Sequence, residues 1–224
     1  ICGTIHYDGV SFRYGYRKWV FQQVTFSVNE GEHVALTGTN GSGKSTLARL
    51  LVGMHEPDTG IITIGGQKIS EIELECLRKH IIYVSQIPVL LSGTIREGLL
   101  FGCTHSINDE LFERIAHGCG VDEIIRDNPF GYDWILTENG MNVSGGHRQR
   151  IAIARALLAE PDILILDEAT SQIDRDLEEK ILQFVFEYRK GKTMYAILRF
   201  QKKTGGKLLN TQKHNERQKE RYKS

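Results

Sequence analysis

One short glycine-rich run has the residue types and the spacing of a phosphate-binding loop. The run is Gly38-Thr39-Asn40-Gly41-Ser42-Gly43-Lys44-Ser45, and it follows an apolar stretch and precedes a segment with helical spacing. Glycines let backbone amides turn inward around phosphate oxygens, the helix start adds the positive end of its dipole, and Lys44 adds a charge. The Ser45 hydroxyl is suited to ligate Mg²⁺. These residues predict binding of a nucleoside phosphate.

The same run matches the Walker A pattern. A flexible glycine-rich turn is the weaker interpretation, because glycine makes up about 7% of residues and a chance match in a chain of this length is on the order of 1%. Lys44 is also expected to act in catalysis. The residues expected to contact the nucleotide here are Gly38, Asn40, Gly41, Ser42, Gly43, Lys44, Ser45 and Thr46.

A second candidate site is an apolar segment that ends in two acids. Residues 163–166 show no polar alternation, which is typical of a parallel strand covered on both faces, and Asp167 and Glu168 follow directly. Because α/β folds place ligands at the carboxyl ends of strands, Asp167 is expected to hold Mg²⁺ and Glu168 to polarise the attacking water. Taken alone, the pattern fits equally well a strand followed by an ordinary helix start.

A third run carries a family resemblance. Val143-Ser144-Gly145-Gly146-His147-Arg148-Gln149-Arg150 resembles the LSGGQ signature of ATP-binding-cassette (ABC) proteins, and it lies between the two other motifs as it does in that family. Ser144, Gly145 and Gly146 would begin a helix and offer a hydroxyl and amides to the γ-phosphate held by a second domain. A Gly-Gly helix entry without a ligand is the alternative. The resemblance covers residues 5–198.

The resemblance implies roles for single residues. Tyr14 lies where the family stacks an aromatic ring on adenine, although an ordinary strand aromatic is equally open. Gln86 corresponds to the Q-loop glutamine, which contacts Mg²⁺ and takes part in catalysis. Asp174, in Ser171-Gln172-Ile173-Asp174, belongs to the D-loop that crosses between subunits. Residues 137–140 stand where exporters carry a loop that contacts transmembrane coupling helices.

An exporter of this family implies ATP and Mg²⁺ as cofactors, and both a second nucleotide-binding domain and transmembrane domains as partners. It would lie on the cytoplasmic face of the cell membrane, and no nucleic acid is expected. Among exporters, the sequence is similar to bacterial peptide or bacteriocin exporters. Two alternatives are a domain that binds ATP with little hydrolysis and a soluble ABC protein that acts on nucleic acid, for which the basic C-terminal tail is the sole support.

The sequence departs from the family in three ways, of which only the last two motivate the first alternative. His147 replaces the usual signature glutamine, which is a mild change. Arg199 occupies the place of the histidine that contacts the γ-phosphate, and an arginine cannot share a proton as an imidazole can. The strands that the family carries after this point are expected to be missing, as they would be in an aberrant or truncated end.

The remaining pattern predicts an α/β fold with a P-loop NTPase core, an antiparallel β subdomain and a helical subdomain that carries the signature. Thr94 with Glu97, and Ser106 with Asp109, have capping-box spacing, and Asp174 is a candidate N-cap. Helices are expected over residues 45–52 and 177–188, and a helical lobe over about 87–158. Strands are expected at residues 10–14, 24–28, 33–37, 61–64, 81–84, 163–166 and 193–198.

Length and composition limit the classes of protein to which the chain can belong. The chain has 224 residues, of which 40% are apolar and 25% charged, so one ordinary globular domain is expected over residues 1–200. Its four cysteines form no CxxC pair, which argues against a disulfide framework or a zinc site. It has no apolar run near the roughly 20 residues that span a bilayer, so a soluble piece of a longer protein is expected. Residues 201–224 hold eight Lys or Arg against two Glu and are expected to form a disordered tail.

Overall fold

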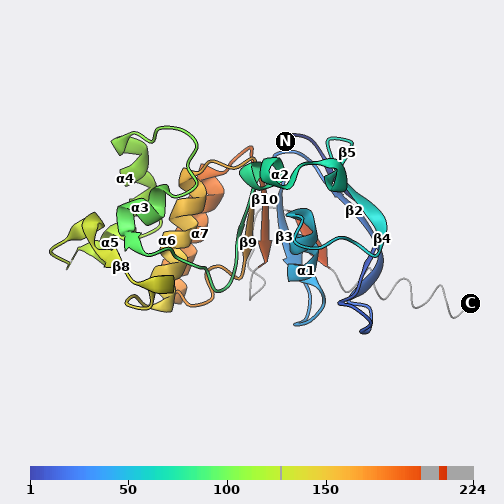
Figure 1. Ribbon diagram of the computed structural model, residues 1–224, viewed down its shortest axis with the longest axis horizontal. Helices are drawn as coiled ribbons and strands as arrows, with labels where there is room; N and C mark the ends of the chain where they lie inside the picture. Colours follow the sequence, from blue (N-terminus) through green and yellow to red (C-terminus); the bar gives the residue numbers. More distant parts are fainter. Residues whose placement is uncertain (127, 198–206, 211–224) are drawn as a thin grey trace, which may run out of the picture. The chain divides into compact units, whose positions relative to one another are not determined.

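The computed structural model describes residues 1–126, 128–197 and 207–210. These residues divide into two compact units (Figure 1). Unit 1 comprises Ile1–Tyr83, Asp162–Asp167 and the described residues from Gly191 onward. Unit 2 comprises the described residues of Val84–Pro161 together with Glu168–Lys190.

The parallel sheet of unit 1 positions the phosphate-binding loop. Its strand order is β11-β3-β10-β9-β6, and β10 pairs in parallel with both β3 and β9, which lie on either side of it (Figure 1). Every residue of β9 and β10 is buried, which confirms the expectation of strands covered on both faces. The strands are β3 (His33–Thr37), β6 (Ile81–Val84), β9 (Ile163–Asp167), β10 (Thr193–Ile197) and β11 (Lys207–Asn210).

The antiparallel sheet of unit 1 confirms the predicted β subdomain. Its order is β2-β1-β4-β5, and β1 with β2, β1 with β4 and β4 with β5 pair antiparallel. One cluster of buried apolar side chains joins both sheets to α1 (Lys44–Leu51), which contributes Leu47, Leu50 and Leu51. Burial of this cluster fixes the helix that follows the glycine-rich loop. The strands are β1 (Ile5–Phe12), β2 (Phe21–Val28), β4 (Thr59–Ile64) and β5 (Gln67–Lys68).

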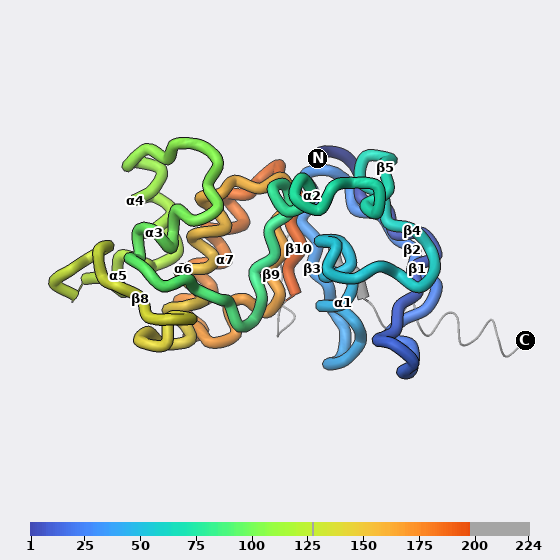
Figure 2. Tube along the Cα trace, in the orientation of Figure 1, coloured from blue at the N-terminus to red at the C-terminus, as the bar shows by residue number. Residues whose placement is uncertain are grey.

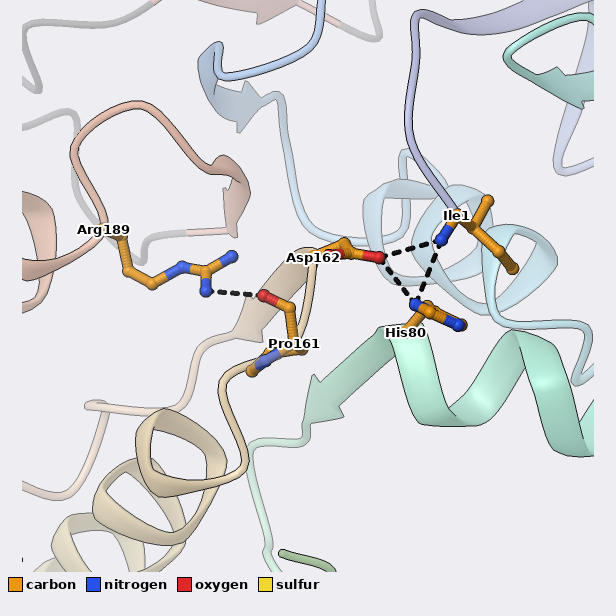
Figure 3. A network of polar contacts seen from close by, with 5 residues as sticks. All are labelled: Ile1, His80, Pro161, Asp162 and Arg189. Carbon is orange, nitrogen blue, oxygen red and sulfur yellow. Dashed lines mark hydrogen bonds and ion pairs between the residues drawn. The ribbon is translucent and has the colours of Figure 1, made fainter. Parts of the chain in front are cut away.

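A polar contact joins α2 (Leu74–His80), which follows the short 3₁₀ turn η1 (Ile69–Glu71), to the start of β9. His80 closes α2, and its Nδ1 lies 2.6 Å from Asp162 Oδ2 (Figure 3). Since Asp162 directly precedes β9, the contact ties the beginning of that strand to the neighbouring helix.

Unit 2 is mostly helical. Helices α3, α4 and α5 contact α6, and in Figure 2 they lie to the left of it. In the same unit, Arg189 is fully buried after α7, and its Nη1 donates to the carbonyl oxygen of Pro161 at 2.6 Å (Figure 3). The elements are α3 (Ile95–Leu100), α4 (Asp109–Gly118), α5 (Val121–Ile125), α6 (Gly145–Leu158), α7 (Arg175–Tyr188), β7 (Gly93–Thr94), β8 (Ile135–Leu136) and the 3₁₀ turns η2 (Gly131–Asp133) and η3 (Glu138–Gly140).

The helix caps test the sequence predictions directly. Thr94 and Glu97 form the predicted capping box of α3, and Asp174 caps α7 as expected. The box predicted at Ser106 is wrong, because α4 is capped by Asn108, whose side chain accepts from the amide of Leu111 at 2.8 Å. Asn108 directly precedes the helix and reaches its third amide, a position that Ser106 cannot take.

The C-terminal segment differs from expectation in one place. Lys207–Asn210 form β11, which pairs in parallel with β3 at Leu208 opposite Ala35. The predictions of disorder and of a missing strand are therefore wrong for these four residues, because their backbone pairs with the edge of β3. Arg199, 201–206 and 211–224 lie outside the described residues. Within the described part of the chain, no helix combines the length and hydropathy needed to cross a membrane.

Candidate functional site

The glycine-rich loop of unit 1 requires glycine at the helix entry. It connects β3 to α1, and Gly43 is the N-cap with a left-handed φ of 90°. A Cβ atom at Gly43 would lie 2.7 Å from Phe21 Cδ1 and 2.8 Å from Val20 Cγ1. Both the backbone conformation and the packing therefore exclude other side chains.

Lys44 folds back over this loop. Its Nζ donates to the carbonyl oxygens of Gly38 at 2.9 Å and Thr39 at 3.0 Å, and the residue is only 8% exposed. No carboxylate of the described residues forms an ion pair with it. A nearly buried ammonium that is bonded only to neutral carbonyls carries an uncompensated positive charge, which suits a phosphate ligand.

The loop meets the end of β9 at Ser45. Its Oγ donates to Asp167 Oδ1 at 2.9 Å, although the two residues are 122 positions apart. Asp167 is 4% exposed, and its other oxygen accepts from the hydroxyl of Tyr83. A hydroxyl and a carboxylate side by side form the hard oxygen donor set that Mg²⁺ prefers, so these residues fit that ion.

Tyr83 was missed by the sequence reasoning. Burial and the hydrogen bond to Asp167 raise the pKa of Tyr83 to about 12, so its hydroxyl is protonated and donates at physiological pH. On its other side it accepts from Arg49 Nε at 3.4 Å. A signal was present in the sequence: Tyr83 is the polar residue in an otherwise apolar strand, β6, that neighbours β9.

Tyr14 lies near the same loop. Its hydroxyl is 3.1 Å from Thr46 Oγ1, in the first turn of α1, and its ring packs edge-on against His55. With 36% of its surface exposed, one part of the ring remains accessible. Stacking on adenine stays a prediction for this residue.

In unit 2, the structure brings together Gln86 and Glu168. Gln86 Nε2 donates to Glu168 Oε2 at 3.2 Å. Glu168 has a φ of 48°, in the left-handed region that is unfavourable for a residue with a side chain. Such a conformation persists where neighbouring contacts fix it, and it occurs preferentially at functional sites.

The signature run begins α6 as predicted. Ser144 is the N-cap, and its side chain accepts from the amide of His147 at 3.1 Å. Gly146 has no room for a side chain, because a Cβ atom would lie 2.8 Å from the backbone carbonyl oxygen of Gln172, and a Cβ atom at Gly145 would lie 1.5 Å from Oε1 of the Gln172 side chain, which would have to move. The helix amides here therefore lie directly beside the D-loop segment.

Two other signature-region residues have defined states. Burial and the neighbouring Arg150 guanidinium lower the pKa of His147, so its imidazole is neutral at physiological pH. Asp174 is exposed and accepts from the amide of Leu177 at 3.1 Å. Its observed contact is that of a helix cap, and contact with a nucleotide stays a prediction.

Gln149 is the second residue that sequence reasoning did not assign a role. It is fully buried, and its side-chain amide forms hydrogen bonds with Gln86, which precedes α6 in the chain, and with Gln172, which follows α6. The signal was its place in the helical repeat, since Gln149 shares the apolar stripe of Ala152, Ile153 and Ala156. A polar side chain on a buried stripe needs partners, and the sequence does not say which.

The predicted site residues thus form two local groups, one per unit. Lys44, Ser45 and Asp167 meet in unit 1, and Gln86 and Glu168 meet in unit 2. Asn40 and Gly41 lie on the exposed part of the loop, consistent with an open ligand side.

The chain is similar in sequence to known proteins. The sequence profile of the ABC transporter family matches residues 21–171. The mitochondrial ATP-dependent permease MDL2 of Saccharomyces cerevisiae is 42% identical over 197 residues, which are 87% of this chain and 26% of that protein. The lactococcin-G-processing and transport ATP-binding protein LagD of Lactococcus lactis is 42% identical over 182 residues, 81% of this chain and 26% of that protein.

A solved structure matches as well. A bacterial Atm1-family ABC exporter with ATP bound superposes with a TM-score of 0.82 at 34% identity, covering 88% of this chain and 35% of that one. The chain therefore spans between 26% and 35% of the length of these three proteins. The expected α/β fold of a nucleotide-binding domain, with its antiparallel and helical parts, is confirmed.

Proposed function

The chain belongs to the ABC transporter family as an ATP-binding domain of exporter type, and from this we propose that it binds Mg-ATP and hydrolyses it to drive export of a substrate across a membrane. The observation that carries the proposal is the contact of Ser45 with Asp167 at 2.9 Å beside the Lys44 loop. It joins a hydroxyl and a carboxylate next to a cationic phosphate-binding loop.

ATP would be held by the loop amides and by Lys44. The Lys44 ammonium would exchange its hydrogen bonds to the carbonyl oxygens of Gly38 and Thr39 for bonds to phosphate oxygens, whose negative charge would balance its positive charge. Ser45 and Asp167 would hold Mg²⁺, with Gln86 as a further ligand. When bound, this ion neutralises charge on the phosphates.

Hydrolysis requires a group that orients water and receives its proton. Glu168 would accept a proton from a water that attacks the γ-phosphorus in line, while the bond to the ADP oxygen breaks and inorganic phosphate leaves. The hydrogen bond from Gln86 leaves the second carboxylate oxygen of Glu168 available for that water.

A second copy of such a domain would complete the site. Ser144, Gly145 and Gly146 begin a helix of 14 residues, whose N-terminal amides favour an anion, and in the proposal that anion is the γ-phosphate held by the other domain. Asp174 would contact the partner from the D-loop. The dimer therefore depends on ATP as the bridging ligand.

An apolar surface on unit 2 supports docking to transmembrane domains. Residues 87–91 and 135–141 lie side by side, since Thr94 pairs with Ile135 and Leu90 packs beside Gly140. We infer attachment to the cytoplasmic face of a membrane through this surface. Its exposed members are Ile87, Val89, Leu91, Ile135 and Met141.

One of the two arguments for the alternative of binding without hydrolysis is weakened. It depended on missing C-terminal strands and on Arg199, and β11 now occupies the edge beside β3. The proposal names no substrate, since a mitochondrial permease and a lactococcin transport protein match equally at 42% identity.

The test is steady-state phosphate release by the purified chain with Mg-ATP. We expect turnover that Glu168→Gln abolishes while ATP still binds, and we expect Lys44→Ala to lose ATP binding. Binding by the unchanged chain without any turnover would refute the hydrolytic function and leave a binding domain. Equal turnover in the Glu168→Gln variant would refute the role assigned to Glu168.

A further inference from the structure

The side chain of Gln149 joins three segments of unit 2. Its Nε2 donates to the carbonyl oxygen of Gln86 at 2.8 Å and to Ser171 Oγ at 3.1 Å. Its Oε1 accepts from the amide of Gln172 at 2.9 Å. One residue of α6 thus bonds to the Q-loop and to two consecutive residues of the D-loop.

The orientation of this amide is fixed by its partners. The Gln86 carbonyl can only accept a hydrogen bond, and the Gln172 amide can only donate one. A flipped Gln149 would place donor against donor and acceptor against acceptor. Because the residue is 0% exposed, water cannot replace a lost partner.

Both partner segments lead to Glu168. Gln86, held at its carbonyl by Gln149, donates through its side chain to Glu168 Oε2 at 3.2 Å. Ser171, held at its hydroxyl by Gln149, donates through its backbone amide to the carbonyl oxygen of Glu168 at 3.1 Å. Gln149 therefore fixes the two residues that bond to Glu168 from opposite ends.

Glu168 needs such support, because its φ of 48° is unfavourable and persists only where surrounding contacts fix it. We propose that Gln149 is a positioning residue that holds Glu168 and Gln86 in the orientation required for ATP hydrolysis. The inference rests on the proposed function, in which Glu168 accepts the proton of the attacking water.

The first experiment compares ATP turnover and ATP affinity in the Gln149→Glu variant of the full chain. The substitution keeps the shape and the acceptor for Gln172 but replaces the donor to Gln86 and Ser171 with an oxygen. We expect kcat to fall by about tenfold or more, which corresponds to about 1.4 kcal/mol in the barrier. The dissociation constant for ATP should change by less than about twofold, because Lys44 and Ser45 belong to unit 1.

A pH profile separates positioning from general damage. A buried glutamate beside a carbonyl oxygen has a raised pKa, and its protonated form regains one donor. The ratio of kcat in Gln149→Glu to kcat in the unchanged chain should therefore rise as the pH falls. Gln67→Glu is the matched control, since Gln67 is exposed on β5, and its ratio should stay near one.

Hydrogen exchange without ATP gives an independent readout. In Gln149→Met, which removes the acceptor, the amide of Gln172 should exchange faster than in the unchanged chain. This variant also serves if Gln149→Glu does not fold. If the unchanged chain turns over ATP and the folded Gln149 variants have the same kcat, the positioning role alone is overturned. If the unchanged chain shows no turnover, the proposed function is overturned and the positioning role with it.

Discussion

Replacement of Gly43 by alanine is expected to destabilise unit 1 for two separate reasons. The backbone at Gly43 is left-handed, with φ of 90°, which costs a residue with a side chain about 1–2 kcal/mol. The new Cβ would also lie 2.7 Å from Phe21 and 2.8 Å from Val20. Overpacking of this kind costs about 1–3 kcal/mol, so the free energy of unfolding should fall by about 2–5 kcal/mol in total.

Gly66 offers a matched control. Its φ of 87° is nearly the same, but nothing lies within 4 Å of the position that a Cβ would take. Gly66→Ala should therefore lose only the backbone part, about 1–2 kcal/mol. Urea unfolding without nucleotide measures both variants, and titration with ATP should show weakened binding for Gly43→Ala alone. If the two variants unfold within about 0.5 kcal/mol of each other, the packing argument is refuted.

Three further predictions use other contacts. Tyr83 has a pKa raised to about 12 in the folded chain, so the stability contributed by its protonated hydroxyl is present below pH 10 and is lost as the pH rises through 12. The Tyr83→Phe variant has no hydroxyl to ionise, so its free energy of unfolding should fall less over that pH range. Thr94→Ala removes a helix cap and should lower the free energy of unfolding in urea by about 1 kcal/mol. Ser106 lies outside the α4 cap, so Ser106→Ala should leave that free energy almost unchanged, and equal losses in the two variants would contradict the assignment of the caps. Truncation after Gly206 removes β11 and should lower the melting temperature measured by circular dichroism, an effect that a tail without structure would not produce.

The sequence predicted most reliably those features that depend on local pattern. Residues 33–37 and 81–84 are strands with the expected bounds, and the apolar run before Asp167 is a buried parallel strand, because burial on both faces leaves no polar alternation. The glycine-rich loop was predictable because its function requires particular residue types at particular positions. The cap at Asn108 was missed because Ser106 shows the same local spacing, and only the true start of the helix decides between them.

Features that depend on long-range pairing were not predictable. β11 is only four residues long, and its pairing with β3 joins positions about 170 residues apart through backbone hydrogen bonds, which no side-chain pattern encodes. The hydroxyl of Tyr83 was missed for the same reason, since its partner Asp167 is 84 positions away. A polar residue on an apolar strand or helix stripe indicates that a partner exists, but the fold alone determines which.

The contacts of Gln149 and Tyr83 have a common consequence for the proposed reaction. Each is a neutral side chain to which the sequence alone assigned no role, and each fixes an acid or its neighbours through hydrogen bonds: Tyr83 bonds to Asp167, and Gln149 bonds to the segments that hold Glu168. Neutral donors orient a carboxylate without adding a cation that would compete with Lys44 for phosphate. Adjacent acids at the end of one strand can therefore serve different roles, because the residues that orient them come from separate parts of the chain.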